Sequence, residues 1–157
     1  MINTKFILPI IVVKDIQKSK KFYKEVLRQT ITLDLGSNIT FNDKFAIQSD
    51  YADLVAVDNF HTSFKSNDHE LYFEESDFDG LLKHLEKFPD IHFIHKTKTY
   101  PWLQRVIRFY DPDFHIIEIG ESMDTIFKNL YDLGITIEEI SKKTYHPIEV
   151  IKKSLNL

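Results

Sequence analysis

The sequence contains no cysteine, which excludes disulfide bonds, thiolate metal ligands and a cysteine nucleophile. Only four of the 157 residues are glycine, too few for the glycine-rich loops that bind phosphates. A long apolar stretch is also missing, because the run at residues 6–13 is short and is interrupted by Pro9. No small-residue cleavage site follows this run, so we expect a cytoplasmic protein without a membrane span.

Positive charge is in slight deficit. Lys and Arg total 20 against 24 Asp and Glu, and the formal net charge of -4 opposes binding to a polyanion. We therefore expect no nucleic-acid partner. Aromatic residues are abundant instead, with 13 Phe and 7 Tyr but a single Trp. Such side chains usually fill a core, and they also line pockets for flat or apolar ligands.

The first fifty residues predict a strand, a helix and three further strands. The β-branched apolar run at residues 6–13 is typical of a buried strand. Asp15 then supplies an N-cap oxygen for a helix. One face of that helix is formed by Ile16, Ser19, Tyr23, Val26 and Leu27. The three strand-like stretches that follow, expected to form an antiparallel meander, are residues 30–35, 38–41 and 45–49.

The same order recurs after a linker at residues 50–68. A strand at Leu71–Phe73 precedes Asp77, which can cap a helix. The apolar face of this helix, which Pro89 and Asp90 end, is formed by Phe78, Leu81, Leu82, Leu85 and Phe88. The expected strands after it are residues 91–96, 103–110 and 115–119.

The two copies keep a constant spacing. Asp15 and Asp77 are 62 residues apart, and so are Ile31 and Phe93 in the strands that follow the helices. Such regularity indicates duplication of one supersecondary unit. We therefore predict an α+β fold in which duplicated βαβββ modules, at about residues 5–50 and 69–120, form a curved mixed sheet.

Two motifs resemble those of a known superfamily. Val13-Lys14-Asp15-Ile16 with Ser19, Phe22-Tyr23 and Leu27 is similar to its V-x-D-ϕ-x-x-S-x-x-FY-x-x-x-L signature. Asp111-Pro112-Asp113 followed by Ile117-Glu118-Ile119 is similar to its closing D-P-D-G-x-x-I-E-L. The chain thus resembles the vicinal oxygen chelate superfamily of glyoxalase I, extradiol dioxygenases, fosfomycin-resistance enzymes and bleomycin-binding proteins. The resemblance implies a glyoxalase/bleomycin-resistance-like domain over residues 1–121. Two glycines of the pattern are replaced by Arg28 and Phe114, where a side chain disfavours the backbone angles that glycine tolerates.

The resemblance also implies four ligand positions, one in the first and one in the last strand of each copy. They correspond to Leu8, Gln48, Glu70 and Glu118, and Leu8 and Glu70 again differ by 62. Divalent metals need three or four strong ligands, whereas leucine supplies none and an amide oxygen is weak. We therefore expect no obligate cofactor, with a divalent metal held by Glu118, Glu70 and Gln48 as the alternative. A register shift of one residue would put His69 in place of Glu70.

Strand alternation predicts which side chains face the concave side of the sheet. Leu71 and Phe73 would pack on the helices, while Trp102 and Arg108 share one face and Arg105 lies on the other. The predicted ligand-binding residues are Gln48, Glu70, Tyr72, Glu74, Trp102, Arg108 and Glu118. Their carboxylates could repel one another and act as general acid or base, bind a cation, or be satisfied by Arg105, Arg108 or water. We expect His92 and His95, on opposite sides of a strand, to be edge or solvated residues.

Residues 122–157 leave the repeat and predict a helical C-terminal extension. A first helix at residues 124–133 would end at Gly134. Thr136 and Glu139 have capping-box spacing for a second at residues 137–143, and Pro147 suits the first turn of a third at residues 148–155. The segment resembles helix-turn-helix motifs of bacterial regulators, although glutamates balance its lysines, unlike the basic stripe of a DNA reader. It would otherwise cover a sheet edge or help a homodimer, which the resemblance implies.

The leading hypothesis is a small molecule bound in the concave sheet without obligate metal. The alternative is a metal-dependent glyoxalase-like lyase or dioxygenase, with the metal polarising substrate oxygens. A second alternative is a regulator that uses the C-terminal helices. The sequence leaves open whether the protein is an enzyme.

Overall fold

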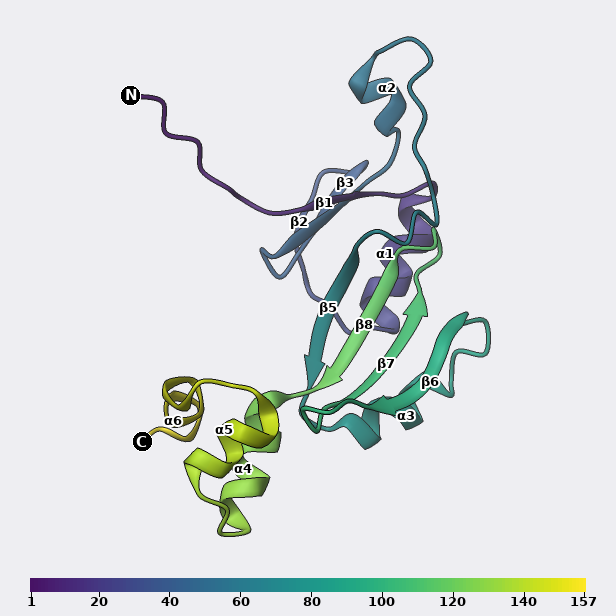
Figure 1. Cartoon of the computed structure of the whole chain (residues 1–157). Helices are drawn as coiled ribbons and strands as arrows, with labels where there is room; N and C mark the ends of the chain where they lie inside the picture. Colours follow the sequence, from purple (N-terminus) through teal and green to yellow (C-terminus); the bar gives the residue numbers. More distant parts are fainter. The chain divides into compact units, whose positions relative to one another are not determined.

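The computed structural model describes residues 1–157 and forms two compact units (Figure 1). Unit 1 consists of residues 1–67 and 111–115, and unit 2 consists of residues 68–110 and 116–157. None of the helices combines the length and the apolar character that crossing a membrane requires.

Unit 1 contains a mixed sheet with strand order β1-β4-β3-β2, in which only β1 and β4 run parallel. Its elements are β1 (Ile10–Val12), α1 (Ile16–Glu25), β2 (Ile31–Asp34), β3 (Asn38–Phe41), β4 (Phe45–Gln48) and α2 (Tyr51–Val55). As predicted, the Asp15 side chain caps α1 by accepting hydrogen bonds from the backbone of Gln17 and Lys18. The core is aromatic, since the rings of Tyr23, Phe41 and Phe45 lie 5.2–5.4 Å apart.

Unit 2 repeats this topology, with strand order β5-β8-β7-β6 and a parallel β5–β8 pair. The repeated elements are β5 (Glu70–Glu75), α3 (Phe78–Leu85), β6 (Phe93–Thr99), β7 (Arg105–Tyr110) and β8 (Ile116–Glu121). The duplicated βαβββ modules are thereby confirmed, and each forms a four-stranded mixed sheet of its own. Asp77 caps α3 through the backbone N–H of Gly80, as its match to Asp15 predicts.

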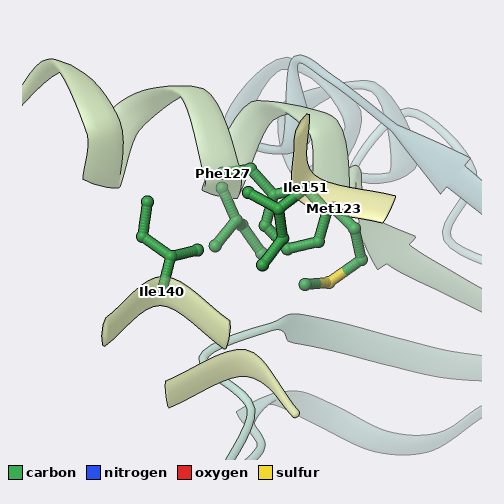
Figure 2. Packing of buried hydrophobic residues seen from close by; sticks show 5 residues of the cluster. Met123, Phe127, Ile140 and Ile151 are labelled. Carbon is green, nitrogen blue, oxygen red and sulfur yellow. The ribbon is translucent and has the colours of Figure 1, made fainter. Parts of the chain in front are cut away.

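Three helices follow β8 and share a small core of their own. They are α4 (Met123–Asp132), α5 (Ile137–Thr144) and α6 (Ile148–Leu155), here called the tail. Thr136 and Glu139 form the predicted capping box, and Gly134 ends α4 with a φ of 80°. The buried residues of the tail core, shown in Figure 2, are Met123, Ile126, Phe127, Ile140 and Ile151.

The structure differs from the sequence-based prediction in three places. Residues 6–9 do not extend β1, because Pro9 has no N–H for the ladder, and Phe6 and Ile7 are exposed. The expected linker contains the short helix α2. Helix α3 ends at Leu85 rather than at Pro89, because the N–H groups of Lys87 and Phe88 bond three residues back and tighten the chain into turns.

Both replaced glycines keep the backbone conformation of a glycine. Arg28 has a φ of 52° and Phe114 a φ of 66°, so each side chain occupies the left-handed region. The turn geometry is retained at the energetic cost of placing a Cβ there.

Candidate functional site

One face of the unit 2 sheet carries a row of polar side chains that crosses all four strands. His95 pairs with Arg108, Arg108 with Glu118, and Glu118 with Tyr72, so the row follows the strand order β6-β7-β8-β5. Glu70 lies two residues before Tyr72 and therefore on the same face. We call this surface the site face. Strand alternation predicted it for Glu70, Tyr72, Arg108 and Glu118.

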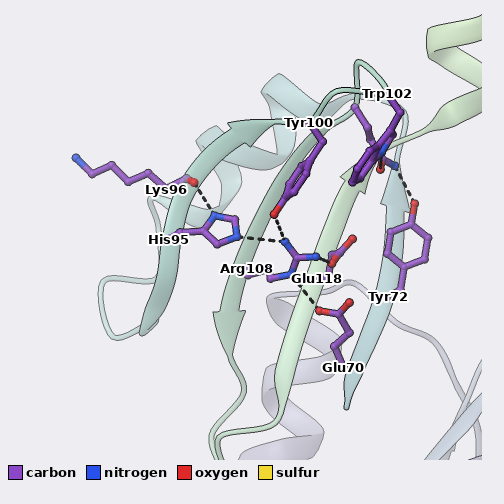
Figure 3. A network of polar contacts seen from close by, with 9 residues as sticks. Glu70, Tyr72, His95, Lys96, Tyr100, Trp102, Arg108 and Glu118 are labelled. Carbon is purple, nitrogen blue, oxygen red and sulfur yellow. Dashed lines mark hydrogen bonds and ion pairs between the residues drawn. The ribbon is translucent and has the colours of Figure 1, made fainter. Parts of the chain in front are cut away.

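Arg108 is the centre of this row (Figure 3). Its Nε donates to Glu70 Oε2 at 3.0 Å, and its Nη2 donates to Glu118 Oε2. Its Nη1 contacts Tyr100 Oη at 2.6 Å and His95 Nε2 at 3.3 Å. His95 Nδ1 lies 2.7 Å from the carbonyl of Lys96, so these contacts assign the proton to Nδ1 and leave Nε2 as an acceptor. We call these five residues, Arg108, Glu70, Glu118, Tyr100 and His95, the Arg108 cluster.

The charges of the Arg108 cluster are balanced only in part. Burial by itself would lower the pKa of Arg108, but the hydrogen bond and charge of Glu70, with Tyr100, raise it above its usual value. The Glu118 side chain is 9% exposed and the Glu70 side chain 38%. Since two carboxylates share one guanidinium, the cluster keeps a formal charge of about one negative unit. Arg108 thus offsets the expected repulsion between Glu70 and Glu118.

A second hydrogen-bonded chain lies beside the cluster. Tyr72 Oη donates to Glu74 at 2.7 Å and accepts from Gln104 Nε2 at 2.8 Å. Burial and the bond to Glu74, opposed by Gln104, raise the pKa of Tyr72 to about 12. Gln104 also donates to the carbonyl of Glu121 and accepts from Trp102 Nε1 at 2.9 Å. The phenol of Tyr72 is therefore held as a neutral donor at physiological pH.

Trp102 connects the second chain with the Arg108 cluster. Its ring stacks on Tyr100 at 4.6 Å with an interplanar angle of 23°. Its other neighbours belong to the core of the tail. Of the six unit 2 residues predicted to bind a ligand, Glu70, Arg108 and Glu118 thus meet directly, while Tyr72, Glu74 and Trp102 belong to the adjoining chain.

Arg105 lies on the opposite face, as alternation predicted. It binds both oxygens of Glu121 at 2.9 and 3.0 Å and Asp79 at 2.7 Å, and it stacks over Phe78. These contacts, above all the hydrogen bond to Glu121, raise the pKa of Arg105. Arg105 therefore connects β7 and β8 with α3 and is not part of the site face.

The donor set does not fit a divalent metal of the kind the superfamily implies. Glu70 and Glu118 both face a fixed guanidinium. Gln48, in unit 1, accepts from Asn38 Nδ2 at 2.9 Å through its only ligating atom, Oε1. Strand pairing matches Ile10 with Ala46 and Glu70 with Ile116, so with Gln48 and Glu118 as equivalents Ile10, two residues after Leu8, becomes the counterpart of Glu70. Either choice is aliphatic, and no step through a metal follows from these residues.

A buried polar network holds the Asp111-Pro112-Asp113 turn in unit 1. Asp111 Oδ2 accepts from Tyr23 Oη at 2.8 Å and lies 2.9 Å from His115 Nδ1. Burial, reinforced by Asp111, raises the pKa of Tyr23, and burial raises that of Asp113. For His115, burial acts to lower the pKa but the hydrogen bond and charge of Asp111 raise it. The two family motifs thus meet in a structural network and supply no reacting group.

Sequence reasoning missed three residues of the site. His95 was expected at an edge or in solvent, but it contacts Arg108, because β6 has register irregularities on both sides of it. Tyr100 was taken only as a hairpin residue. Gln104 shares the parity of Trp102 and Arg108, and this signal could have placed it on the site face.

Comparison with known proteins identifies related folds. The family whose model matches is described as a glyoxalase-like domain, and the match covers residues 6–124. A solved protein of unknown function from Agrobacterium tumefaciens is 35% identical, with a TM-score of 0.67 over 78% of this chain and 98% of its own. No curated protein matches the sequence.

Two further solved structures, less than 20% identical, show likeness of fold alone. Lactoylglutathione lyase from Agrobacterium tumefaciens is 18% identical, with a TM-score of 0.58 over 76% of this chain and 95% of its own. A glyoxalase/bleomycin resistance protein/dioxygenase from Nocardioides is 19% identical, with a TM-score of 0.59 over 77% of this chain and 85% of its own.

Proposed function

The chain belongs to the glyoxalase-like domain family, as its two motifs indicated, and on that premise we propose that it binds a small molecule on the site face without an obligate metal. The observation that carries this proposal is the position of Arg108. Its guanidinium engages both Glu70 and Glu118, so a positive group of the protein itself already binds the acids that a metal would need.

The chemistry of the site face favours a flat organic cation. Arg108 is already bonded to two carboxylates and to Tyr100, which makes it a poor receptor for an anion. The remaining charge is negative, and the carboxylates keep lone pairs that can accept further hydrogen bonds. Tyr72 is 49% exposed beside them and offers an aromatic surface. Aromatic faces attract cations, so charge and shape favour the same ligand class.

Three probes of one shape and different charge test this assignment. Benzamidine is a cation, benzamide is neutral and benzoate is an anion. We expect titration by NMR to show binding in the order benzamidine, benzamide, benzoate, with a preference for the cation of about tenfold, the size of a screened interaction of 1–2 kcal/mol. Equal binding of the three probes, or a preference for benzoate, would reject the cation site.

A matched variant localises the binding. Glu118→Gln removes one negative charge from the site face and should abolish most of the preference for benzamidine. Asp79→Asn removes the same charge from the opposite side, where Asp79 pairs with Arg105, and should leave the preference unchanged. Equal effects of the two variants would show a long-range charge effect instead of a site.

The same titration tests metal independence. Affinity for benzamidine should be the same, within about twofold, in 1 mM EDTA and in 0.1 mM Mn²⁺. The metal-dependent lyase or dioxygenase requires the opposite result, a metal that raises both ligand affinity and melting temperature.

A further inference from the structure

The tail contacts the site face through one side chain, that of Trp102. The indole packs against the buried core of α4, α5 and α6, a cluster that includes the fully buried Ile140 and Ile151. Its opposite surface stacks on Tyr100 at 4.6 Å. Trp102 thus lies between a helical core and the aromatic wall of the site.

Trp102 determines the position of both tyrosines of the site. Tyr100 stacks on the indole and contacts Arg108 through its hydroxyl at 2.6 Å. The indole N–H donates to Gln104, whose amide donates to Tyr72 at 2.8 Å. The stacked face and the N–H edge of one ring therefore act on two different side chains of the site face (Figure 3).

Backbone contacts join the tail to the same residues. The N–H of Met123, the first residue of α4, lies 3.3 Å from Glu74 Oε2, the carboxylate that also accepts from Tyr72. Gln104 donates to the carbonyl of Glu121, two residues before α4. The start of the tail and the indole are thus fixed to one hydrogen-bonded chain.

We propose that Trp102 is a positioning residue through which the tail sets the geometry of the ligand site, an inference that rests on the proposed function. The family match ends at residue 124, so the core that supports Trp102 lies almost entirely outside the matched region. Trp102 acts through Tyr100 and Gln104. Because coupling between two sites is reciprocal, a ligand on the site face must also stabilise the tail.

Affinity for benzamidine in the full chain provides the first test. Ile151→Ala opens a cavity in the tail core and should weaken benzamidine binding at least about fivefold, the lower range of measured couplings. The matched control Ile39→Ala removes the same atoms from the core of unit 1, where Ile39 is also fully buried, and should leave affinity unchanged. Trp102→Phe, which can still stack, should bind more tightly than Trp102→Leu. Equal loss in these two variants, or no loss in Ile151→Ala, would overturn the proposal.

Reciprocity gives a readout that a merely structural role would not change. Saturating benzamidine should slow amide hydrogen exchange in α4–α6 of the wild type and have no such effect in Trp102→Leu. Unchanged exchange in the wild type, with benzamidine bound, contradicts the inference.

A double-mutant cycle separates this inference from the proposed function, because it needs no ligand. The losses of unfolding free energy caused by Tyr100→Leu and Ile151→Ala should be non-additive. Additive losses reject the coupling through Trp102 and leave the ligand site standing. Absence of benzamidine binding together with non-additive losses rejects the cation site alone.

Discussion

Arg108 and Glu118 are direct cross-strand partners in the antiparallel β7–β8 pair, and their side chains form an ion pair on the site face. Glu118 is the acid that the closing family motif places at a metal. Here a guanidinium from the neighbouring strand neutralises it, and the same guanidinium binds Glu70. The register of two strands has thus placed a fixed cation where the superfamily resemblance predicted an exchangeable one.

Replacing Arg108 should destabilise the protein. Arg108→Met leaves Glu118 almost buried without its partner, and we expect a loss of about 1–3 kcal/mol in the free energy of unfolding, below the range for fully buried pairs because Arg108 is partly exposed. Arg108→Lys keeps the charge without the planar fork and should lose less. Urea unfolding of the three proteins measures this. A variant Arg108→Met as stable as the wild type would show that water satisfies Glu118.

Gly120 in β8 is required by the close approach of Gln104. A Cβ at residue 120 would lie 2.4 Å from Gln104 Nε2 and 3.2 Å from Tyr72 Oη. Gln104 cannot move away without losing its bonds to Tyr72 and to the Glu121 carbonyl, so Gly120→Ala should cost about 1–3 kcal/mol. In a Gln104→Ala background the same substitution should cost much less. Equal costs in both backgrounds would assign the effect to the backbone of β8.

Stability should fall as pH rises through the pKa of His115. Its folded-state pKa is raised, so the folded protein holds the proton more tightly than the unfolded chain. The resulting stabilisation is fully present below the unfolded pKa, about 6.5, and is lost as pH rises through the folded value. Urea unfolding between pH 5.5 and 9 should show this decline, and His115→Asn should flatten it. The exposed His61, replaced in the same way, serves as the control. An unchanged slope in His115→Asn would contradict the assignment.

Restoring glycine at residue 28 should stabilise the protein. Arg28 is exposed and has a φ of 52°, so Arg28→Gly removes a Cβ from the left-handed region. The gain should be about 1 kcal/mol, or about 2–4 °C in melting temperature for a chain of this size. Arg28→Ala keeps the Cβ and removes the charge, and it should show no comparable gain. If both variants are equally stabilised, charge and not backbone conformation is responsible.

The parts of this protein that were predictable are those set by neighbours in sequence. The caps at Asp15 and Asp77 and the Thr136–Glu139 box were found because a side chain bonds to backbone two or three residues away. Alternation in β5, β7 and β8 placed Glu70, Tyr72, Arg108 and Glu118 on one face for a similar reason.

The contacts of the site depend on register between strands, which the sequence does not specify. Arg108 meets Glu118 only because residue 108 pairs with residue 118, and it meets His95 across irregular pairing of β6 with β7. The contact of Trp102 with the tail depends on the packing of helices that begin twenty residues later. Parity predicts a face, whereas the partner of each side chain requires the tertiary structure.

Tyr23 and Asp111 are separated by 88 residues, yet their hydrogen bond is internal to unit 1. A gene fragment that stops at Asn67 would therefore encode a Tyr23 hydroxyl buried without its acceptor. A fragment that begins at Asp68 would carry the Asp111–His115 turn without Tyr23, Ser19 and the Lys14 backbone, which bond to it. Neither half is a self-sufficient product, and a split or permuted version of this protein must keep residues 14–23 and 111–115 in one polypeptide or bring two polypeptides together.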